Sequence, residues 1–173
     1  KSGVTIMHMA ETMDTGDIIM TEEVVLAKDE TAGTLHDKLA EIGGPLLVTA
    51  MDALENGRAP RIRQNEEEAT HVKILDKTMG NIDFTKSARQ LERWIRGLNP
   101  WPVATTEIQG ASFKVFKAVK TMKKGECGKI LSADKDGITI ACSDGAVCIT
   151  ELQAAGGKRM KAADYLRGHP ICL

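Results

Sequence analysis

The chain has 173 residues, 42% of them apolar and 27% charged, an ordinary globular composition that leaves one or two domains open. No apolar run approaches the roughly 18 residues that a membrane span needs, so the composition predicts a soluble protein with no membrane partner. The net charge of −1 excludes neither an acidic nor a basic binding partner, because it conceals an uneven distribution along the chain.

The charge distribution separates an acidic front from a basic back. Residues 1–69 carry 6 basic and 14 acidic side chains, residues 70–103 carry 6 and 3, and residues 104–173 carry 11 and 7. A basic back half is typical of a module that binds a polyanion. A merely solvated surface is the alternative interpretation of the same charges.

All cysteines lie in the last third of the chain, and none forms a CxxC pair: Cys127, Cys142, Cys148 and Cys172. This spacing favours neither a disulfide framework nor a zinc site, so we expect reduced thiols, a cytoplasmic location and no metal. The chain begins Lys1-Ser2-Gly3-Val4, without an initiator methionine or a leader pattern. We therefore expect a fragment of a longer protein.

The first part of the chain is predicted to be α/β. Residues 4–9 are typical of a strand covered on both faces, and residues 18–26 form a second strand or ribbon. A helix is expected over residues 34–54, capped by Thr34 and kinked or restarted at residues 43–45, which read Gly-Gly-Pro. Residues 57–64 lose the apolar pattern and indicate an exposed linker.

The second part is predicted to be one helix followed by a small β domain. The helix begins near Thr85, and its apolar stripe includes Leu91 and Ile95. Five strands separated by turn signals follow, over residues 103–109, 112–119, 127–133, 138–142 and 146–153, before a short helix over 162–167. Because closure removes exposed edges from so small a sheet, an OB-like β-barrel is expected.

These elements divide the chain into three predicted parts. Residues 1–64 form an α/β part, residues 65–102 form a linker with the connecting helix, and residues 103–173 form the all-β part. The predicted fold class is therefore α/β plus all-β.

The motif MDTGDII, residues 13–19, lies between the first two strands. Spacing alone favours a turn in which the side chains of Asp14 and Asp17 bond nearby backbone amides. His8, on the preceding strand, is expected to be a partly buried structural histidine, because no second metal-type ligand stands near it.

Basic side chains recur at helical spacing on the face opposite the apolar stripe: Lys86, Arg89, Arg93 and Arg96. The basic surface extends over the β part through Lys114, Lys158, Arg159 and Lys161. A strict two-residue period would turn the side chain of Lys117 to the face opposite Lys114. Such rows bind phosphates or simply face solvent. Trp94 and Trp101 are expected to pack the helix end against the β domain rather than to stack on bases.

Three segments resemble one known family, the methionyl-tRNA formyltransferases. They are TGDIIMTEEVVLAKDETAGTLHDKL, HVKILDKTMGNIDFTKSARQLERWIRGLNPWP and DGAVCITELQAAGGKRMKAADYLRGHP, and the likeness covers nearly the whole chain. Of these, the combination of IRGLNPWP with ELQAAGGKRM is the most specific, whereas DTGD also occurs in sibling formyltransferases.

The resemblance implies a monomeric enzyme in which a Rossmann-like domain binds 10-formyltetrahydrofolate and an OB-like domain helps to hold the initiator methionyl-tRNA. The formyl group would move onto the methionyl amine. Asp14 matches the family's catalytic aspartate, and the backbone of Met13 would lie beside the folate. The family's catalytic asparagine and histidine lie upstream of these residues, so the chain alone is expected to be inactive.

Two other functions stay open at this point. One is a non-catalytic OB-type RNA-binding module. A protein that only binds RNA would have no need of the apolar strand pair and the DTGD motif, so these features disfavour this function. The other is a sibling formyltransferase acting on a sugar or a ribonucleotide, which the basic β part disfavours.

Overall fold

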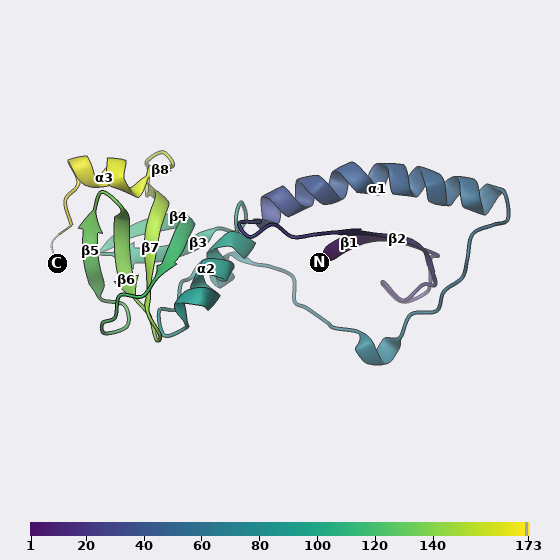
Figure 1. The fold of residues 1–173 in the computed structure, drawn as a ribbon, viewed down its shortest axis with the longest axis horizontal. Helices are drawn as coiled ribbons and strands as arrows, with labels where there is room; N and C mark the ends of the chain where they lie inside the picture. Colours follow the sequence, from purple (N-terminus) through teal and green to yellow (C-terminus); the bar gives the residue numbers. More distant parts are fainter. Residues whose placement is uncertain (172) are drawn as a thin grey trace. The chain divides into compact units, whose positions relative to one another are not determined.

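The structure is a computed structural model that describes residues 1–171 and 173, and it divides into two compact units, Lys1–Ile74 and Leu75–Leu173 (Figure 1). The first unit is a hairpin with one long helix, and the second is an antiparallel sheet with short helices. None of the helices in the described part of the chain is long and apolar enough to cross a membrane.

The first unit is built on an antiparallel hairpin of β1 (Ser2–Met7) and β2 (Ile18–Val24), along which α1 (Ala32–Glu55) lies (Figure 1). Val4 of β1 faces Gly43 of α1, whereas the alternate residue Thr5 is exposed. The prediction of a strand covered on both faces is therefore wrong for the described unit, because α1 covers only one face of the hairpin.

Helix α1 presents apolar residues on two sides. Leu46 and Ala50 are buried together with Ile19 of β2. Further apolar side chains of the helix are between 45% and 60% exposed: Leu47, Val48, Met51 and Leu54. Helices with this much exposed apolar surface usually pack against another polypeptide surface.

The helix begins earlier than predicted and is not interrupted. Its N-cap is Thr31, whose side chain accepts a hydrogen bond from the Thr34 amide while the Thr34 hydroxyl accepts one from the Thr31 amide. Both ends of a capping box are thus supplied by threonines, and Thr34 is its third helical residue. The predicted restart at residues 43–45 is also wrong, because α1 continues through Pro45 as one helix.

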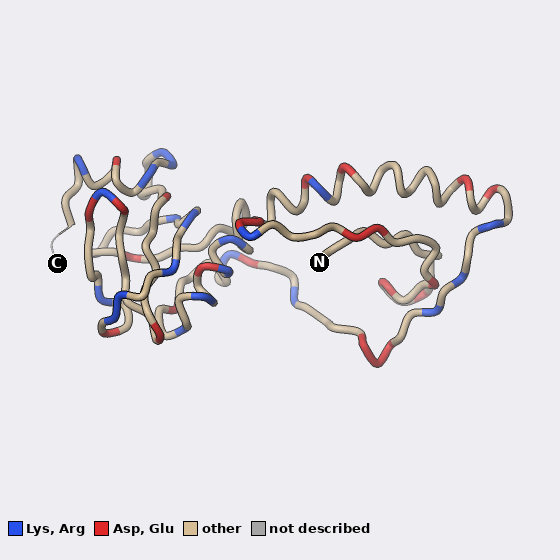
Figure 2. Tube along the Cα trace, in the orientation of Figure 1, with Lys and Arg blue, Asp and Glu red and all other residues tan. Residues whose placement is uncertain are grey.

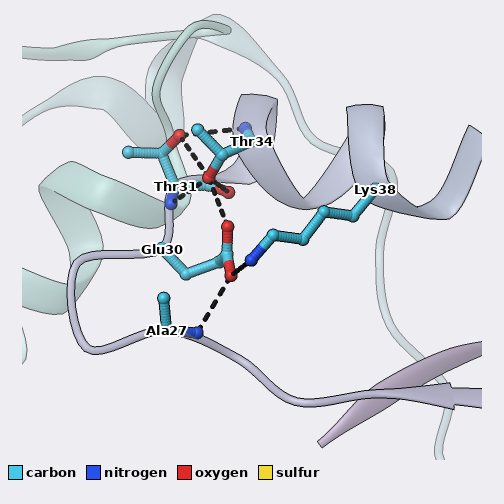
Figure 3. Close-up of polar contacts among 5 residues, drawn as sticks. All are labelled: Ala27, Glu30, Thr31, Thr34 and Lys38. Carbon is cyan, nitrogen blue, oxygen red and sulfur yellow. Dashed lines mark hydrogen bonds and ion pairs between the residues drawn. The ribbon is translucent and has the colours of Figure 1, made fainter. Parts of the chain in front are cut away.

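Glu30 ties the start of α1 to the segment that precedes it (Figure 3). Its carboxylate accepts hydrogen bonds from the Ala27 amide at 2.9 Å, from the Thr34 hydroxyl and from the Lys38 ammonium group. Only 7% of the Glu30 side chain is exposed. The hydrogen bond from Lys38, followed by those from Thr34 and Ala27, lowers the pKa of this carboxyl from 4.5 to about 2.

Replacing Glu30 with glutamine is expected to destabilise the start of α1 at neutral pH. Because the folded pKa is depressed, the carboxylate contributes stability above pH 4.5 and loses that contribution as the pH falls towards 2. The variant should therefore lose midpoint temperature at pH 7 and show a flatter acid dependence between those values. Helix circular dichroism during thermal unfolding measures both effects, and the exposed Glu41→Gln on the same helix is the control. An unchanged acid dependence in the Glu30 variant would contradict this role.

The second unit begins with the 3-10 turn η2 (Lys77–Gly80) and the helix α2 (Ala88–Gly97). Its strands are β3 (Ala104–Ile108), β4 (Ala111–Thr121), β5 (Ile130–Asp134), β6 (Gly137–Ala141), β7 (Ala146–Ala154) and β8 (Met160–Lys161), followed by α3 (Ala162–Gly168). The five predicted strands and the last helix are confirmed, and β8 is a further short strand.

Helix α2 and the sheet share one apolar core. Ile95 of α2 is fully buried against the sheet, in the same cluster as Val115, Ile138 and Leu152. The helix starts at the Ser87 cap, where the side chains and amides of Ser87 and Gln90 form a capping box. The predicted apolar stripe of α2 is confirmed, and the stripe fixes which helix face remains outside the core.

The sheet of the second unit is fully antiparallel, in the order β3-β4-β7-β6-β5, with β8 added to β7 (Figure 1). Within the described residues no pairing joins the end strands β3 and β5, so the strands form an open path. The antiparallel sheet agrees with the all-β prediction, whereas the expected closed barrel is not observed among the described residues.

Candidate functional site

Asp14 lies in the loop that connects β1 to β2. Its side chain is exposed, and its carboxylate makes no hydrogen bond to any described residue. The Asp14 backbone has φ of 60°, in the left-handed region that few residues other than glycine adopt. The loop therefore holds a carboxylate towards solvent in an uncommon backbone conformation. Met13, predicted to lie beside a folate, is 88% exposed in the same loop.

Residues 60–64, expected to be a plain linker, hold this loop in place. Gln64 donates hydrogen bonds from its side-chain amide to the backbone carbonyls of Asp14 at 2.9 Å and Gly16 at 2.7 Å. Ile62 pairs with Ile18 at the start of β2. Sequence patterns gave no signal for Gln64, because a single long-range polar contact leaves no periodicity.

Asp17 has a different environment from Asp14. Its side chain is 34% exposed and forms an ion pair with Arg61 at 3.2 Å, and its backbone carbonyl accepts a hydrogen bond from the His8 amide at 2.9 Å. His8 is half-buried, as expected for a structural histidine. Asp17 thus fixes the base of the loop directly before β2, whereas the carboxylate of Asp14 is exposed and has no partner within the described residues.

Gly16 is the tightest point of the loop. A Cβ atom at this position would stand 1.7 Å from the carbonyl oxygen of His8, so the substitution Gly16→Ala cannot be accommodated without moving the backbone. We expect a loss of about 1–3 kcal/mol or more in stability of the first unit, together with faster proteolysis within residues 8–17. Gly44→Ala is the matched control, because its Cβ would meet open space. Equal proteolysis of the two variants would contradict the tight packing of the loop.

The basic residues predicted on α2 form what we call the helix row: Lys86, Arg89, Arg93 and Arg96. Arg89 and Arg93 are exposed and make no ion pair within the described residues. Lys86 lies 3.8 Å from the Asp83 carboxylate. Arg96 binds Glu92 through Nε and Nη2, and both side chains are only about one-fifth exposed, at 21% and 23%. The charge available for a ligand is therefore concentrated at Arg89 and Arg93.

A second basic surface lies on β4 and around β8, and we call it the strand patch: Lys114, Lys117, Lys158, Arg159 and Lys161. Lys114 and Lys117 pair with Gln153 and Glu151 of β7, which are two residues apart and so share a face. A bulge between Val115 and Ala118 shifts the alternation by one residue. The expectation that Lys117 faces opposite to Lys114 is therefore wrong.

Arg159 contacts two side chains of its own unit. Its guanidinium lies 4.3 Å from the Phe116 ring centroid, and its Nε donates to the Glu151 carboxylate at 2.6 Å. The same hydrogen bond holds the pKa of Glu151 below its ordinary value and raises that of Arg159. Arg159 thus positions the turn that carries Lys158, which is exposed. Figure 2 shows lysines and arginines on both the helix and the strands of this unit.

The two tryptophans, which were expected to pack the helix end against the β domain, are both exposed. Trp94 is 44% exposed and Trp101 is 53% exposed. The indole Nε1 of Trp94 donates a hydrogen bond to the Met79 carbonyl at 2.9 Å, which fixes the ring next to η2. Each tryptophan thus keeps about half of its surface exposed.

Thiols and metal ligands offer no further site in the part of the chain that is described. Cys127, Cys142 and Cys148 are free, and burial raises the pKa of Cys142 to about 11. Cys172 lies outside the described residues. No cluster of three histidine, cysteine or acidic side chains suited to a metal ion occurs among residues 1–171 and 173.

The chain thus combines an α/β unit that exposes the Asp14 carboxylate with a β unit of 16 basic and 10 acidic side chains. The family described as "Formyl transferase" matches residues 1–51, and the one described as "Formyl transferase, C-terminal domain" matches residues 74–170. The second match covers more than half of the chain. The chain belongs to the formyl transferase family.

Individual relatives carry a more specific name. The chain is 43% identical over 98% of its length to the methionyl-tRNA formyltransferase of Lachnospira eligens, and 42% identical over 99% to that of Clostridioides difficile. It spans 56% of the length of each of these relatives. The chain is therefore a homologue of methionyl-tRNA formyltransferase that corresponds to about half of these proteins.

A solved structure shares the fold at low sequence identity. HypX from Aquifex aeolicus, in complex with tetrahydrofolic acid, matches 95% of this chain and 29% of its own, with a TM-score of 0.69 and 20% identity. An identity this low supports a common fold and no more.

Proposed function

We propose that the chain is part of an enzyme that transfers the formyl group of 10-formyltetrahydrofolate to the amino group of methionyl initiator tRNA. The observation that carries this proposal is the 43% identity across 98% of the chain to a methionyl-tRNA formyltransferase. The unpaired carboxylate and the basic surface fit the two tasks of such an enzyme, proton transfer and tRNA binding.

In the proposed reaction Asp14 relays a proton, directly or through water. The attacking amine must lose a proton and the departing folate nitrogen must gain one, and a carboxylate near the formyl carbon can serve both needs. Asp14 is exposed, makes no hydrogen bond through its carboxylate within the described residues, and sits in a loop clamped by Gln64. Uncommon backbone conformations of this kind cluster at functional sites.

The folate would bind next to the same loop, with the Met13 backbone beside it. Its formyl oxygen becomes negatively charged during transfer and needs hydrogen-bond donors. Asparagine and histidine, which the resemblance places upstream of these residues, would supply those donors. Residues 1–173 alone are accordingly proposed to lack formyl transfer, and assays require the full-length protein.

The second unit is proposed to hold the tRNA through its phosphates. Basic side chains supply most of the affinity for nucleic acids without reading bases. Arg89 and Arg93 of the helix row and Lys114, Lys158 and Lys161 of the strand patch are exposed. Lys86, Arg96 and Arg159 belong to the same surface, but each of them also contacts an acidic neighbour.

The finer fold assignment is also a proposal. The hairpin and α1 would be the end of a Rossmann-like domain, over residues 1–64, and the exposed apolar side of α1 would pack against the rest of that domain. Residues 65–102 would connect it to an OB-like domain formed by residues 103–173, with α2 of the connection packed on the sheet of that domain, in a protein that acts as a monomer. The exposed Leu47, Val48 and Met51 support this assignment, because packing would remove them from water.

Formyl transfer by the full-length protein with different acceptor amines tests the proposal. Radiolabelled formyl groups are supplied on the folate to charged initiator tRNA, to glycinamide ribonucleotide and to an amino-sugar nucleotide in parallel. Label is expected on the tRNA alone. Label on either small acceptor would favour a sibling formyltransferase, and label on none would favour a non-catalytic RNA-binding protein.

A further inference from the structure

A groove of about 540 Å³ runs along α2 in the second unit and is not explained by phosphate binding alone. Its floor contains Leu91 and Leu98, each only 3% exposed. The partly exposed Trp94 forms part of its wall, and Lys86 and Arg93 lie in its lining. An apolar floor, an open aromatic ring and basic side chains are thus gathered in one concave site.

The chemistry of this lining matches one occupant best. We propose that the groove binds an unpaired nucleotide of the bound RNA, with the base stacked on Trp94 and its phosphate held by Arg93. The inference rests on the proposed function, because it assumes that the second unit binds tRNA. Bases that stack on exposed aromatic rings add affinity that does not depend on their sequence.

The geometry of Trp94 supports stacking rather than simple packing. Its Nε1–H is already used by the Met79 carbonyl at 2.9 Å, so the ring is held in one orientation while 44% of the residue stays exposed. Gly97 follows three residues later on the same helix, and a Cβ built on Gly97 meets no atom within 4 Å. The missing side chain therefore leaves open space on the Trp94 side of α2.

The polar groups of the groove suit a nucleotide as well. Arg93 makes no ion pair within the described residues, so its guanidinium is available for a phosphate. The side-chain amide oxygen of Gln90 accepts hydrogen bonds from the Ser87 amide and hydroxyl. The NH₂ group of Gln90 is therefore left to donate to a base edge. Asp83 also lies in the lining, and its charge is offset by Lys86 at 3.8 Å.

Quenching of Trp94 fluorescence tests the groove directly. The chain carries Trp101→Phe so that Trp94 is its only indole, and the probes are a tetranucleotide of adenosine and an abasic tetranucleotide with the same phosphates. The adenosine probe is expected to quench the fluorescence and to bind about 5- to 150-fold more tightly than the abasic one. Equal binding and equal quenching of the two probes would overturn the proposal.

Two variants separate the groove from the phosphate contacts. Gly97→Leu should fill the groove and remove the difference in affinity between the two probes, with the unfolding temperature unchanged. Trp94→Phe should retain part of that difference in affinity. Affinity for intact tRNA should fall in Gly97→Leu without a change in its salt dependence. If Gly97→Leu kept full discrimination, the groove assignment would be wrong. Loss of tRNA binding on reversal of Arg89, which does not line the groove, would still support the proposed function.

Discussion

Replacing Asp14 with asparagine in the full-length protein is expected to lower the rate of formyl transfer by about 100- to 10,000-fold. Asparagine preserves the size of the side chain and tolerates the left-handed backbone at this position, so the loop should keep its shape. It cannot accept and return a proton in the same way. The affinity for tRNA should stay unchanged, because the basic surface lies in the other unit.

Single-turnover formyl transfer, together with a separate tRNA-binding measurement, checks this result. Asp17→Asn is the matched control, since it makes the same substitution three residues away in a side chain that pairs with Arg61. The control should lose a little stability and keep most of its turnover. Near-normal turnover in the Asp14 variant would rule out its role in proton transfer.

Reversing the charge of both Arg89 and Arg93 to glutamate is expected to produce the second large effect. Each side chain is exposed and makes no ion pair within the described residues, so each can neutralise a phosphate. Losing two such contacts should weaken tRNA binding and reduce the slope of log K against log salt by about 2. Filter binding of tRNA at salt concentrations from about 50 to about 200 mM measures this slope.

A control with the same change in net charge separates local contacts from the overall field. Lys129 and Lys135 are exposed on the segment around β5 and have no proposed contact with tRNA, so Lys129→Glu with Lys135→Glu is the matched pair. This pair should shift affinity much less than the pair on α2. An equal loss in both double variants would mean that only the total charge matters.

Local patterns predicted the second unit well. The apolar stripe of α2 and the turn signals between the strands each depend on residues close together in the sequence, and the observed elements lie within a few residues of their predicted bounds. The bulge near Val115 was not predictable in the same way, because it depends on the register with β7. Closure of the sheet likewise depends on pairing between distant strands.

The Asp14 loop shows the same limit at the candidate site. Spacing could not distinguish Asp14 from Asp17, and the resemblance to a family was needed to favour one of them. The structure supplies a physical difference, since Asp17 is paired with Arg61 and Asp14 is not paired within the described residues. Gln64 and Arg61 come from a segment without periodicity, so only the folded chain reveals their role.

Formylation of methionyl initiator tRNA is the proposed function of the full-length protein. Its most direct test is formyl transfer by the full-length protein to initiator and elongator tRNAs carrying the same methionyl group. The proposed function predicts formylmethionine on the initiator tRNA and much slower transfer to the elongator. Absence of formylmethionine from both tRNAs, with active folate donor present, would contradict it.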